Sequence, residues 1–264
     1  FKTFEIYQQS KINIFKYQNP DDILICNLDD SIIQKKVISK YPEDRQFLYS
    51  LNKKVKKGSW VENNKLIFSD GNIHLEMFDF KNETYLKGDH NKDNIMAAVC
   101  ACKLSGIPDH KIEVGISSFR GLEHRMEYVG VYDNVIYYND SIATIPEASI
   151  QAVNTLKNVD TLILGGFDRG INYDLFINFL VTSKISNLIF LGKAGKRIMK
   201  GLEEKNNNNK NMFFVYSMEE AVKIATQHTK KTGICLLSPA AASYDMFKNF
   251  EERGNVYKKI VRGL

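Results

Sequence analysis

The stretch TLILGGFDRG, residues 161–170, decides how the second half of this chain folds. It begins as a continuously apolar run and ends as a glycine-rich turn that carries Asp168 and Arg169. Continuous apolar runs of this length are typical of parallel strands that are covered on both faces. Further runs of the same kind follow along the chain: NLIFLG (187–192), FFVYS (213–217) and ICLLS (234–238).

Helical segments separate these apolar runs. Their predicted positions are residues 146–157, 173–183, 194–204 and 218–230. The alternation of helices and buried strands predicts a doubly wound, Rossmann-like α/β domain. MEYVGVYDNVIYYND (126–140), just before it, predicts a β-hairpin. In doubly wound sheets ligands bind beyond the carboxyl ends of the strands, so we expect a site in the segments that follow the strands.

The first half of the chain has a different pattern. Apolar residues at near-helical spacing predict a helix over residues 4–16, and ILICN (23–27) predicts a buried strand. Alternating residues between 48 and 78 predict antiparallel strands joined by turns. GDHNKDNIMAAVCACKLSG (88–106) predicts an apolar helix with a polar first turn.

The pattern changes after FRGLEHR (119–125), which predicts a domain boundary near 119–122. We therefore expect one domain over residues 1–120 and another over residues 121–264, both within the usual size range of domains. The chain opens with FKTFEIYQQSK and has no methionine at the start, so we expect this start to be a fragment boundary.

The overall composition is that of an ordinary globular protein, with 44% hydrophobic and 25% charged residues. No apolar run approaches the roughly 20 residues that span a bilayer, so membrane insertion is not expected. The net charge of +5 is spread along the chain, which does not indicate a nucleic-acid partner. Cys26, Cys100, Cys102 and Cys235 lack metal-binding spacing. We expect buried thiols and a reducing, cytoplasmic setting.

Polar residues follow the predicted strands. NDSIATIPEA (139–148) sets the carboxylate of Asp140 at a strand end and the hydroxyl of Thr144 near the start of a helix. Capping a helix is the alternative role for such residues. In GGFDRG, the guanidinium of Arg169 offers two parallel donors to a carboxylate or phosphate, although glycine-rich turns with an arginine are common. These side chains are candidates for a ligand site.

Another candidate strand end is LSPAAASYDMFKNFEERG (237–254). Ser243 follows a strand and precedes a helix, so its hydroxyl and the nearby backbone amides are suited to a carboxylate. Phe250 is expected to close the pocket. The charged run EER (251–253) is expected to order the helix surface instead.

Further candidates are weaker on physical grounds. His124 and Arg125 lie at the domain junction, a frequent place for ligand clefts, but a surface or hinge contact is the commoner role. Asn91 and Asn94 lie three apart on one face of a helix, and capping accounts for one of them. Lys11 lies on an amphipathic helix, where a solvated lysine is the default.

Together these stretches resemble the Mur ligases of peptidoglycan precursor synthesis, most closely the branch that adds glutamate. The resemblance runs in order through GDHNKDNIMAA, GLEHRMEYV, YYNDSIATIPEA, LILGGFDRGINY and LLSPAAASYDMFKNFEERG. It implies that residues 1–120 are the later part of a central ATPase domain and that residues 121–264 are a Rossmann-like domain for glutamate. The P-loop pattern G-x-x-x-x-G-K-[ST] occurs nowhere in the sequence.

The resemblance assigns roles to individual residues. Lys11 falls where the family has a lysine that becomes carbamylated and then provides an oxygen ligand for Mg²⁺. Asn91 and Asn94 match positions on the adenine side of ATP, and Arg125 and Asp140 match positions that reach the phosphates and ribose. The implied glutamate pocket consists of Thr144, Arg169, Ser243, Tyr244 and Phe250.

The implied reaction is ATP-dependent amide formation. ATP phosphorylates the carboxylate of UDP-N-acetylmuramoyl-L-alanine, and the amine of glutamate attacks the acyl phosphate. The implied partners are therefore these two substrates, and we expect a monomer. Segment 119–122 would be the hinge on which the two domains close.

Several alternatives stay open. Ile142 replaces a lysine that many relatives carry, and similar versions occur in the branch that adds L-glutamate, although D-glutamate is the commoner substrate. Another ligase of the superfamily, such as folylpolyglutamate synthase, is the nearest rival enzyme. Because the P-loop is absent, we expect residues 1–264 alone to be inactive, and a glutamate- or nucleotide-binding fragment is the non-enzymatic alternative.

Overall fold

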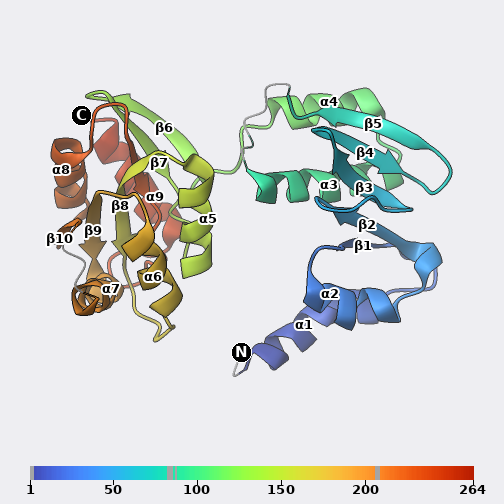
Figure 1. Ribbon diagram of the computed structural model, residues 1–264, viewed down its shortest axis with the longest axis horizontal. Helices are drawn as coiled ribbons and strands as arrows, with labels where there is room; N and C mark the ends of the chain where they lie inside the picture. The colour runs from blue at the N-terminus through green and yellow to red at the C-terminus, as the bar shows by residue number, and fades with distance from the viewer. Residues whose placement is uncertain (1–2, 82–85, 87, 206–208) are drawn as a thin grey trace. The chain divides into compact units, whose positions relative to one another are not determined.

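The computed structural model describes residues 3–81, 86, 88–205 and 209–264 (Figure 1). It divides into two compact units, Phe1–Arg120 and Gly121–Leu264. Each unit has a β-sheet and its own hydrophobic core. Among the described helices, none is both long and apolar enough to cross a lipid bilayer.

The first unit is built on a five-stranded sheet with the order β1-β2-β3-β4-β5. Its strands are β1 (Leu24–Asn27), β2 (Gln46–Ser50), β3 (Gly58–Glu62), β4 (Lys65–Ser69) and β5 (His74–Asp79). β1, β2 and β3 run parallel, whereas β3, β4 and β5 run antiparallel. The predicted antiparallel pairing is confirmed for β3 to β5 but is wrong for β2, because alternation along a strand does not show which way its neighbour runs.

The helices of the first unit are α1 (Phe4–Lys16), α2 (Ser31–Lys36), α3 (Asp89–Leu104) and α4 (Asp109–Ser118), with short 3-10 turns at Ile38–Lys40 and Glu43–Arg45. The predicted helices α1 and α3 are confirmed. α3 packs on the sheet (Figure 1). Its Met96 and Cys100 are fully buried in the core of this unit. All four cysteines are free thiols; Cys26 and Cys235 are also buried, while Cys102 is half-buried.

The second unit contains a six-stranded sheet with the order β10-β9-β8-β11-β7-β6. Its strands are β6 (Glu127–Tyr132), β7 (Val135–Asn139), β8 (Val159–Gly165), β9 (Asn187–Leu191), β10 (Asn211–Val215) and β11 (Ile234–Leu237). Neighbouring strands from β10 to β7 run parallel, and the predicted hairpin of β6 and β7 is confirmed. β8, β9 and β11 are buried throughout. In β10 only Val215 is fully buried, but Met212 and Phe214 pack against one core and Phe213 against the other, so both faces of this edge strand are covered in part.

Helices cover both faces of this sheet (Figure 1). They are α5 (Pro146–Leu156), α6 (Asp174–Thr182), α7 (Gly192–Glu204), α8 (Met218–His228) and α9 (Phe250–Val261). α5, α6 and α7 form one core with the sheet, around the fully buried Phe176 and Leu162. α8 and α9 form the other core, around the fully buried Ile163 and Tyr257. The doubly wound α/β prediction is confirmed.

The connections of this sheet create a switch point between β8 and β11. From β8 the chain passes through α6 to β9 and through α7 to β10, always on one side of β8. It then returns through α8 to β11 on the other side of β8. Ligands of doubly wound sheets bind beyond the carboxyl ends of the strands at such a point. The segments that follow β7, β8 and β11 are therefore candidates for a site.

Candidate functional site

Backbone hydrogen bonds join the segments that follow β7, β8 and β11. The N–H of Asp140, after β7, donates to the carbonyl oxygen of Leu237 at 2.7 Å. The N–H of Phe167, after β8, donates to the carbonyl oxygen of Ala242, after β11, at 2.9 Å. We name these joined segments, residues 139–145, 165–170 and 238–247, the strand-end edge.

Arg253 of α9 holds two of these segments together, although the residue is only 2% exposed. Its Nε donates to the hydroxyl of Ser141 at 2.9 Å, and its Nη2 donates to the carbonyl of Ser141 at 2.8 Å. Nη1 donates to the carbonyls of Ala241 and Ala242 at 3.1 and 3.2 Å, and Nη2 also donates to Ala241 at 3.1 Å. These five contacts use every N–H donor of the guanidinium.

The prediction that Arg253 orders the helix surface is wrong. Arg253 lies on the inner side of α9 with Phe250, Gly254 and Tyr257, at spacings of three and four residues. In the sequence, this spacing of three and four residues indicates that Arg253 shares the buried face of the helix. The adjacent Glu251 and Glu252 favour the opposite interpretation, a solvated face. Burial lowers the pKa of Arg253 to about 10, which still leaves the guanidinium charged at neutral pH.

The glycine-rich turn after β8 fits closely against the segment after β11. Gly166 has a φ of +136°, in the region that favours glycine. A Cβ at this position would lie 2.3 Å from the carbonyl oxygen of Ala242 and 3.1 Å from Nη1 of Arg253. The second glycine of GGFDRG is therefore required by this close approach.

Asp140 is buried in the strand-end edge. Its Oδ1 accepts a hydrogen bond from the N–H of Met126 at 3.1 Å, and its Oδ2 lies 2.7 Å from the hydroxyl of Ser238. The Ser238 hydroxyl also lies 2.9 Å from that of Ser149, which donates to the Ser238 carbonyl at 3.0 Å. Burial raises the pKa of Asp140 to about 6, against the opposing effects of Ser238, Met126 and Arg125. Its contact with a nucleotide stays a prediction.

Thr144 and Arg169 meet across the switch point. Nη2 of Arg169 donates to the carbonyl oxygen of Thr144 at 2.6 Å. The neighbouring Asp168 forms its ion pair with Arg197 instead, at 3.0 Å. Within the described ranges, no acidic side chain forms an ion pair with Arg169. Its exposed guanidinium therefore keeps donors for an anionic ligand.

The other predicted pocket residues lie after β11 and on α9. Ser243 is 2% exposed, and its hydroxyl forms no hydrogen bond with any residue that the structure describes. Tyr244 is 68% exposed, and its ring meets that of Phe167 edge-on with centroids 6.5 Å apart. The ring of Phe250 lies edge-on to His124 at 6.1 Å. The structure thus brings Tyr244 to the glycine-rich turn but leaves its side chain largely in solvent.

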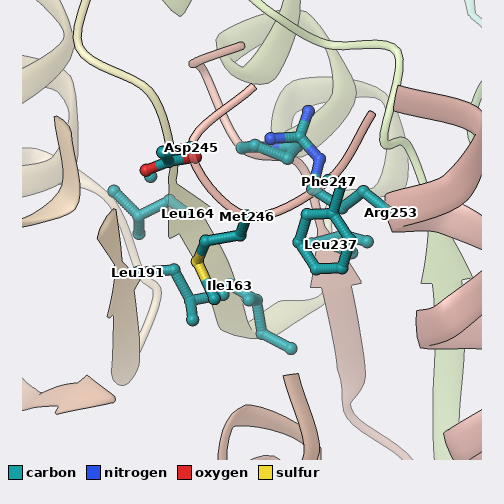
Figure 2. A pocket seen from close by; sticks show the side chains of 11 residues that line it. Ile163, Leu164, Leu191, Leu237, Asp245, Met246, Phe247 and Arg253 are labelled. Atoms are coloured by element: carbon teal, nitrogen blue, oxygen red, sulfur yellow. The ribbon is translucent and has the colours of Figure 1, made fainter. Parts of the chain in front are cut away.

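A small pocket is lined in part by residues of the strand-end edge, among them Gly166, Pro239 and Met246 (Figure 2). Ile163 and Leu191 contribute to its apolar lining, and Met246 and Phe247 enter from the segment after β11 (Figure 2). Asp245 and Arg253 also line it. Because the lining is mainly apolar, an amino acid with two carboxylates and an ammonium group fits the polar strand-end edge better than this pocket.

A buried network of polar side chains lies beside β7. Nδ2 of Asn139 lies 3.0 Å from Nδ1 of His124 and 2.9 Å from Oε2 of Glu127. The ammonium group of Lys258 on α9 donates to Oε1 of Glu127 at 2.9 Å. Burial, and then the charge of Lys258, lower the pKa of His124, so the ring is neutral at pH 7. The network anchors the chain next to Arg125, which is itself exposed.

In the first unit, the predicted adenine-side residues lie next to each other on α3. Nδ2 of Asn94 lies 3.5 Å from Oδ1 of Asn91. The prediction that one of them caps the helix is wrong, because α3 begins at Asp89 and Gly88 occupies the cap position. Two adjacent amides suit a base edge, and this role stays a prediction.

Lys11 is exposed on α1, with its Nζ 5.6 Å from the centre of the Tyr7 ring. An unmodified lysine offers no oxygen ligand to a metal. In the part of the chain that the structure describes, no group of three or more His, Cys, Asp or Glu residues is arranged to hold a metal ion. The described residues therefore do not fit a complete magnesium site, and carbamylation of Lys11 stays a prediction.

Comparison with known proteins places this chain in a family. Residues 1–102 match the Mur ligase middle domain. The UDP-N-acetylmuramoylalanine--D-glutamate ligase of Thermoanaerobacter sp. (strain X514) is 36% identical over 263 residues, which cover 100% of this chain and 57% of that protein. The chain belongs to the Mur ligase family. A Mur ligase of the same name from Clostridioides difficile (strain 630) is also 36% identical, over 99% of this chain and 56% of that protein.

Solved structures show that this Mur ligase chain shares its fold with related proteins. A pseudomurein peptide ligase type C from Methanothermus fervidus has a TM-score of 0.68 and 16% identity, over 98% of this chain and 60% of that chain. FolC of E. coli in complex with ADP has a TM-score of 0.58 and 17% identity, over 81% of this chain and 47% of that chain. At such identities the likeness shows the fold alone. The chain spans 57% of the length of its Thermoanaerobacter relative.

Proposed function

We propose that this chain supplies the glutamate-binding unit and part of the ATP-binding unit of a ligase that adds D-glutamate to UDP-N-acetylmuramoyl-L-alanine. The observation that carries the proposal is the strand-end edge, where Thr144, Arg169 and Ser243 lie on segments joined at the switch point. The names of relatives 36% identical to the chain support it. The product would be a precursor of peptidoglycan.

The charges of the strand-end edge suit glutamate. The planar fork of Arg169 can bind one carboxylate through two parallel hydrogen bonds. The Ser243 hydroxyl would donate to the other carboxylate. Phe250 would offer an apolar contact to the methylene groups between them. An amino acid without the side-chain carboxylate would leave Arg169 unpaired, so this residue would favour glutamate over neutral amino acids.

In the proposed reaction ATP supplies the phosphoryl group that activates the alanyl carboxylate. The amine of glutamate then attacks the acyl carbon, a C–N bond forms, and phosphate leaves. The strand-end edge would hold the amine in the right direction, because fixing the geometry of two reactants lowers the barrier.

The same reaction needs groups that bind ATP. Asn91 and Asn94 would bind the adenine side, and Arg125 and Asp140 would bind the phosphates and ribose. As a carbamate, Lys11 would supply one oxygen ligand to Mg²⁺, although the described residues alone do not form a complete magnesium site.

The test uses the intact gene product with UDP-N-acetylmuramoyl-L-alanine, ATP, Mg²⁺ and each enantiomer of glutamate. Phosphate release and the mass of the product are measured. We expect both signals with D-glutamate. Phosphate release without glutamate would contradict the assignment, as would phosphate release that requires a different amino acid. Activity with L-glutamate alone would assign the chain to the L-glutamate branch, the alternative that Ile142 favours.

A second candidate function is binding without turnover. It is favoured by the absence of a P-loop pattern from residues 1–264. For this polypeptide alone we expect binding of D-glutamate in titration calorimetry and no consumption of ATP in a phosphate-release assay. Turnover by residues 1–264 would rule out the binding-only alternative.

A further inference from the structure

We propose that Arg253 is a positioning residue for the amino-acid substrate, because its guanidinium holds the strand-end edge in the shape that binds glutamate. The inference rests on the proposed function. It adds a residue that acts on the pocket through backbone carbonyls, without contacting the substrate itself.

The acceptors of Arg253 are all uncharged oxygens, namely three backbone carbonyls and one hydroxyl. Among the described residues, no carboxylate forms an ion pair with it, and Asp245 acts on its charge only from a longer distance. Burying a cation against neutral partners costs free energy of desolvation. A contribution to stability therefore does not explain why this position carries an arginine. The fixed geometry of its five N–H donors, which can hold several carbonyls in place at once, does explain it.

The acceptors of Arg253 lie close in sequence to the predicted pocket. Ser141 lies in the segment that carries Thr144. Ala242 directly precedes Ser243, and its carbonyl also accepts a hydrogen bond from the turn after β8 at 2.9 Å. That turn carries Arg169, which in turn donates to the carbonyl of Thr144. A single guanidinium thus limits the movement of all the segments that form the pocket.

Ser141 links this arrangement back to α9. Its hydroxyl accepts from Nε of Arg253 at 2.9 Å and donates to the carbonyl oxygen of Phe250 at 2.8 Å. Phe250 is itself a predicted pocket residue and lies less than one helical turn from Arg253. Loss of the guanidinium would therefore loosen Thr144, Ser243 and Phe250 together.

The first test is steady-state kinetics of the intact gene product carrying Arg253→Lys, which keeps the charge but not the five-donor fork. We expect the KM for glutamate to rise roughly 10- to 100-fold, since small misplacements of binding groups have large effects. The KM for ATP should stay within about twofold. Lys259→Ala, on the exposed side of α9, is the matched control and should change neither constant.

Chemical rescue separates positioning from general loss of structure. Arg253→Ala leaves space for a guanidinium ion, so millimolar guanidinium should lower the glutamate KM of this variant while ammonium should not. Thermal unfolding of every variant is recorded to confirm that it is folded at the assay temperature. If no Arg253 variant folds, Ser141→Ala decides the question, because it removes one acceptor and should raise the glutamate KM about fivefold.

The outcomes distinguish this inference from the proposed function. An unchanged glutamate KM in folded Arg253→Lys would overturn the positioning role, as would an equal rise in both KM values without guanidinium rescue. An unchanged KM in Ser141→Ala, where that variant decides, would also overturn it. In each case the proposed function would stand. A wild-type protein without glutamate-dependent phosphate release would overturn both.

Discussion

Arg169 presents its guanidinium at the carboxyl end of β8, with one N–H bound to the carbonyl of Thr144. We predict that Arg169→Ala raises the KM for glutamate by roughly 10-fold or more and changes kcat less, because a donor to the substrate carboxylate is lost. Steady-state kinetics of the intact gene product measures both constants. Lys196→Ala, an exposed lysine on α7, is the control. A glutamate KM that stays at the wild-type value would contradict the carboxylate role.

Gly254 is required by a buried ring that packs against α9. A Cβ at this position would lie 2.1 Å from Nδ1 of His124 and 3.0 Å from Nδ2 of Asn139. We predict that Gly254→Ala lowers the free energy of unfolding by about 1–3 kcal/mol, because overpacking outweighs the better helix propensity of alanine. Urea unfolding followed by circular dichroism measures this change.

Gly263→Ala is the control for this prediction. The nearest atom to a Cβ at Gly263 would be 3.4 Å away, an ordinary contact distance. Its free energy of unfolding should stay within about 0.5 kcal/mol of the wild type. Equal stability of the Gly254→Ala and Gly263→Ala variants would show that His124 can move at little cost.

At the scale of elements, a chain of hydroxyls links the end of β7 to β11 and α5. With Asp140 protonated, it can donate to Ser238, Ser238 can donate to Ser149, and Ser149 can donate to the Ser238 carbonyl. With Asp140 ionised, the Ser238 hydroxyl donates its hydrogen to the carboxylate. Because the Ser149 hydroxyl donates to the Ser238 carbonyl, no hydrogen then lies between the Ser238 and Ser149 hydroxyls, which are 2.9 Å apart. Burial is the larger effect and raises the pKa of Asp140 to about 6, although the hydrogen bond with Ser238 acts to lower it.

This arrangement predicts a pH dependence of stability. The pKa of Asp140 rises from 3.8 to about 6 on folding, so the folded state binds more protons between these values. The contribution to stability is therefore full below about pH 4 and is lost as pH rises through about 6. Asp140→Asn keeps a donor for Ser238 and cannot ionise. We predict that the wild type loses about 1–3 kcal/mol relative to Asp140→Asn between about pH 4 and 7.

Urea unfolding of the wild type and Asp140→Asn at both ends of this pH range checks the prediction. The difference in their free energies of unfolding is the relevant quantity, because other titrating groups affect both proteins alike. A difference that is independent of pH would show that Asp140 keeps an ordinary pKa in the folded state.

The elements also show where sequence patterns were sufficient. β8, β9 and β11 were predicted correctly, because cover on both faces leaves continuously apolar runs. β10 has a similar apolar run, but it lies at the sheet edge and is only partly buried. β2 was assigned the wrong pairing direction. Edge position and strand direction depend on which segments pair, and a period of two along one strand does not contain that information.

At the scale of the whole molecule, the unit Gly121–Leu264 has hydrophobic cores on both faces of its own sheet. The residues predicted to bind glutamate all lie within it. We predict that residues 121–264 alone unfold in one cooperative transition and bind D-glutamate with an affinity similar to that of residues 1–264. Circular dichroism in urea and titration calorimetry measure these properties. Binding by the longer chain alone would show that the first unit contributes to the site.

The sequence by itself determined the doubly wound second half, most of the helices and strands, and the ordered motifs that indicate the Mur ligase family. Those features follow from local periodicity and residue spacing. Only the tertiary structure decided that Arg253 is buried and that the carboxylate of Asp140 is hydrogen-bonded to the hydroxyl of Ser238. Arg253 and Ser141 are 112 residues apart, and Asp140 and Ser238 are 98 apart. Contacts of this kind form only when segments that are distant in the sequence pack together. From the sequence, a charged side chain can be expected to need polar partners when it is buried, but neither its burial nor the identity of those partners can be predicted.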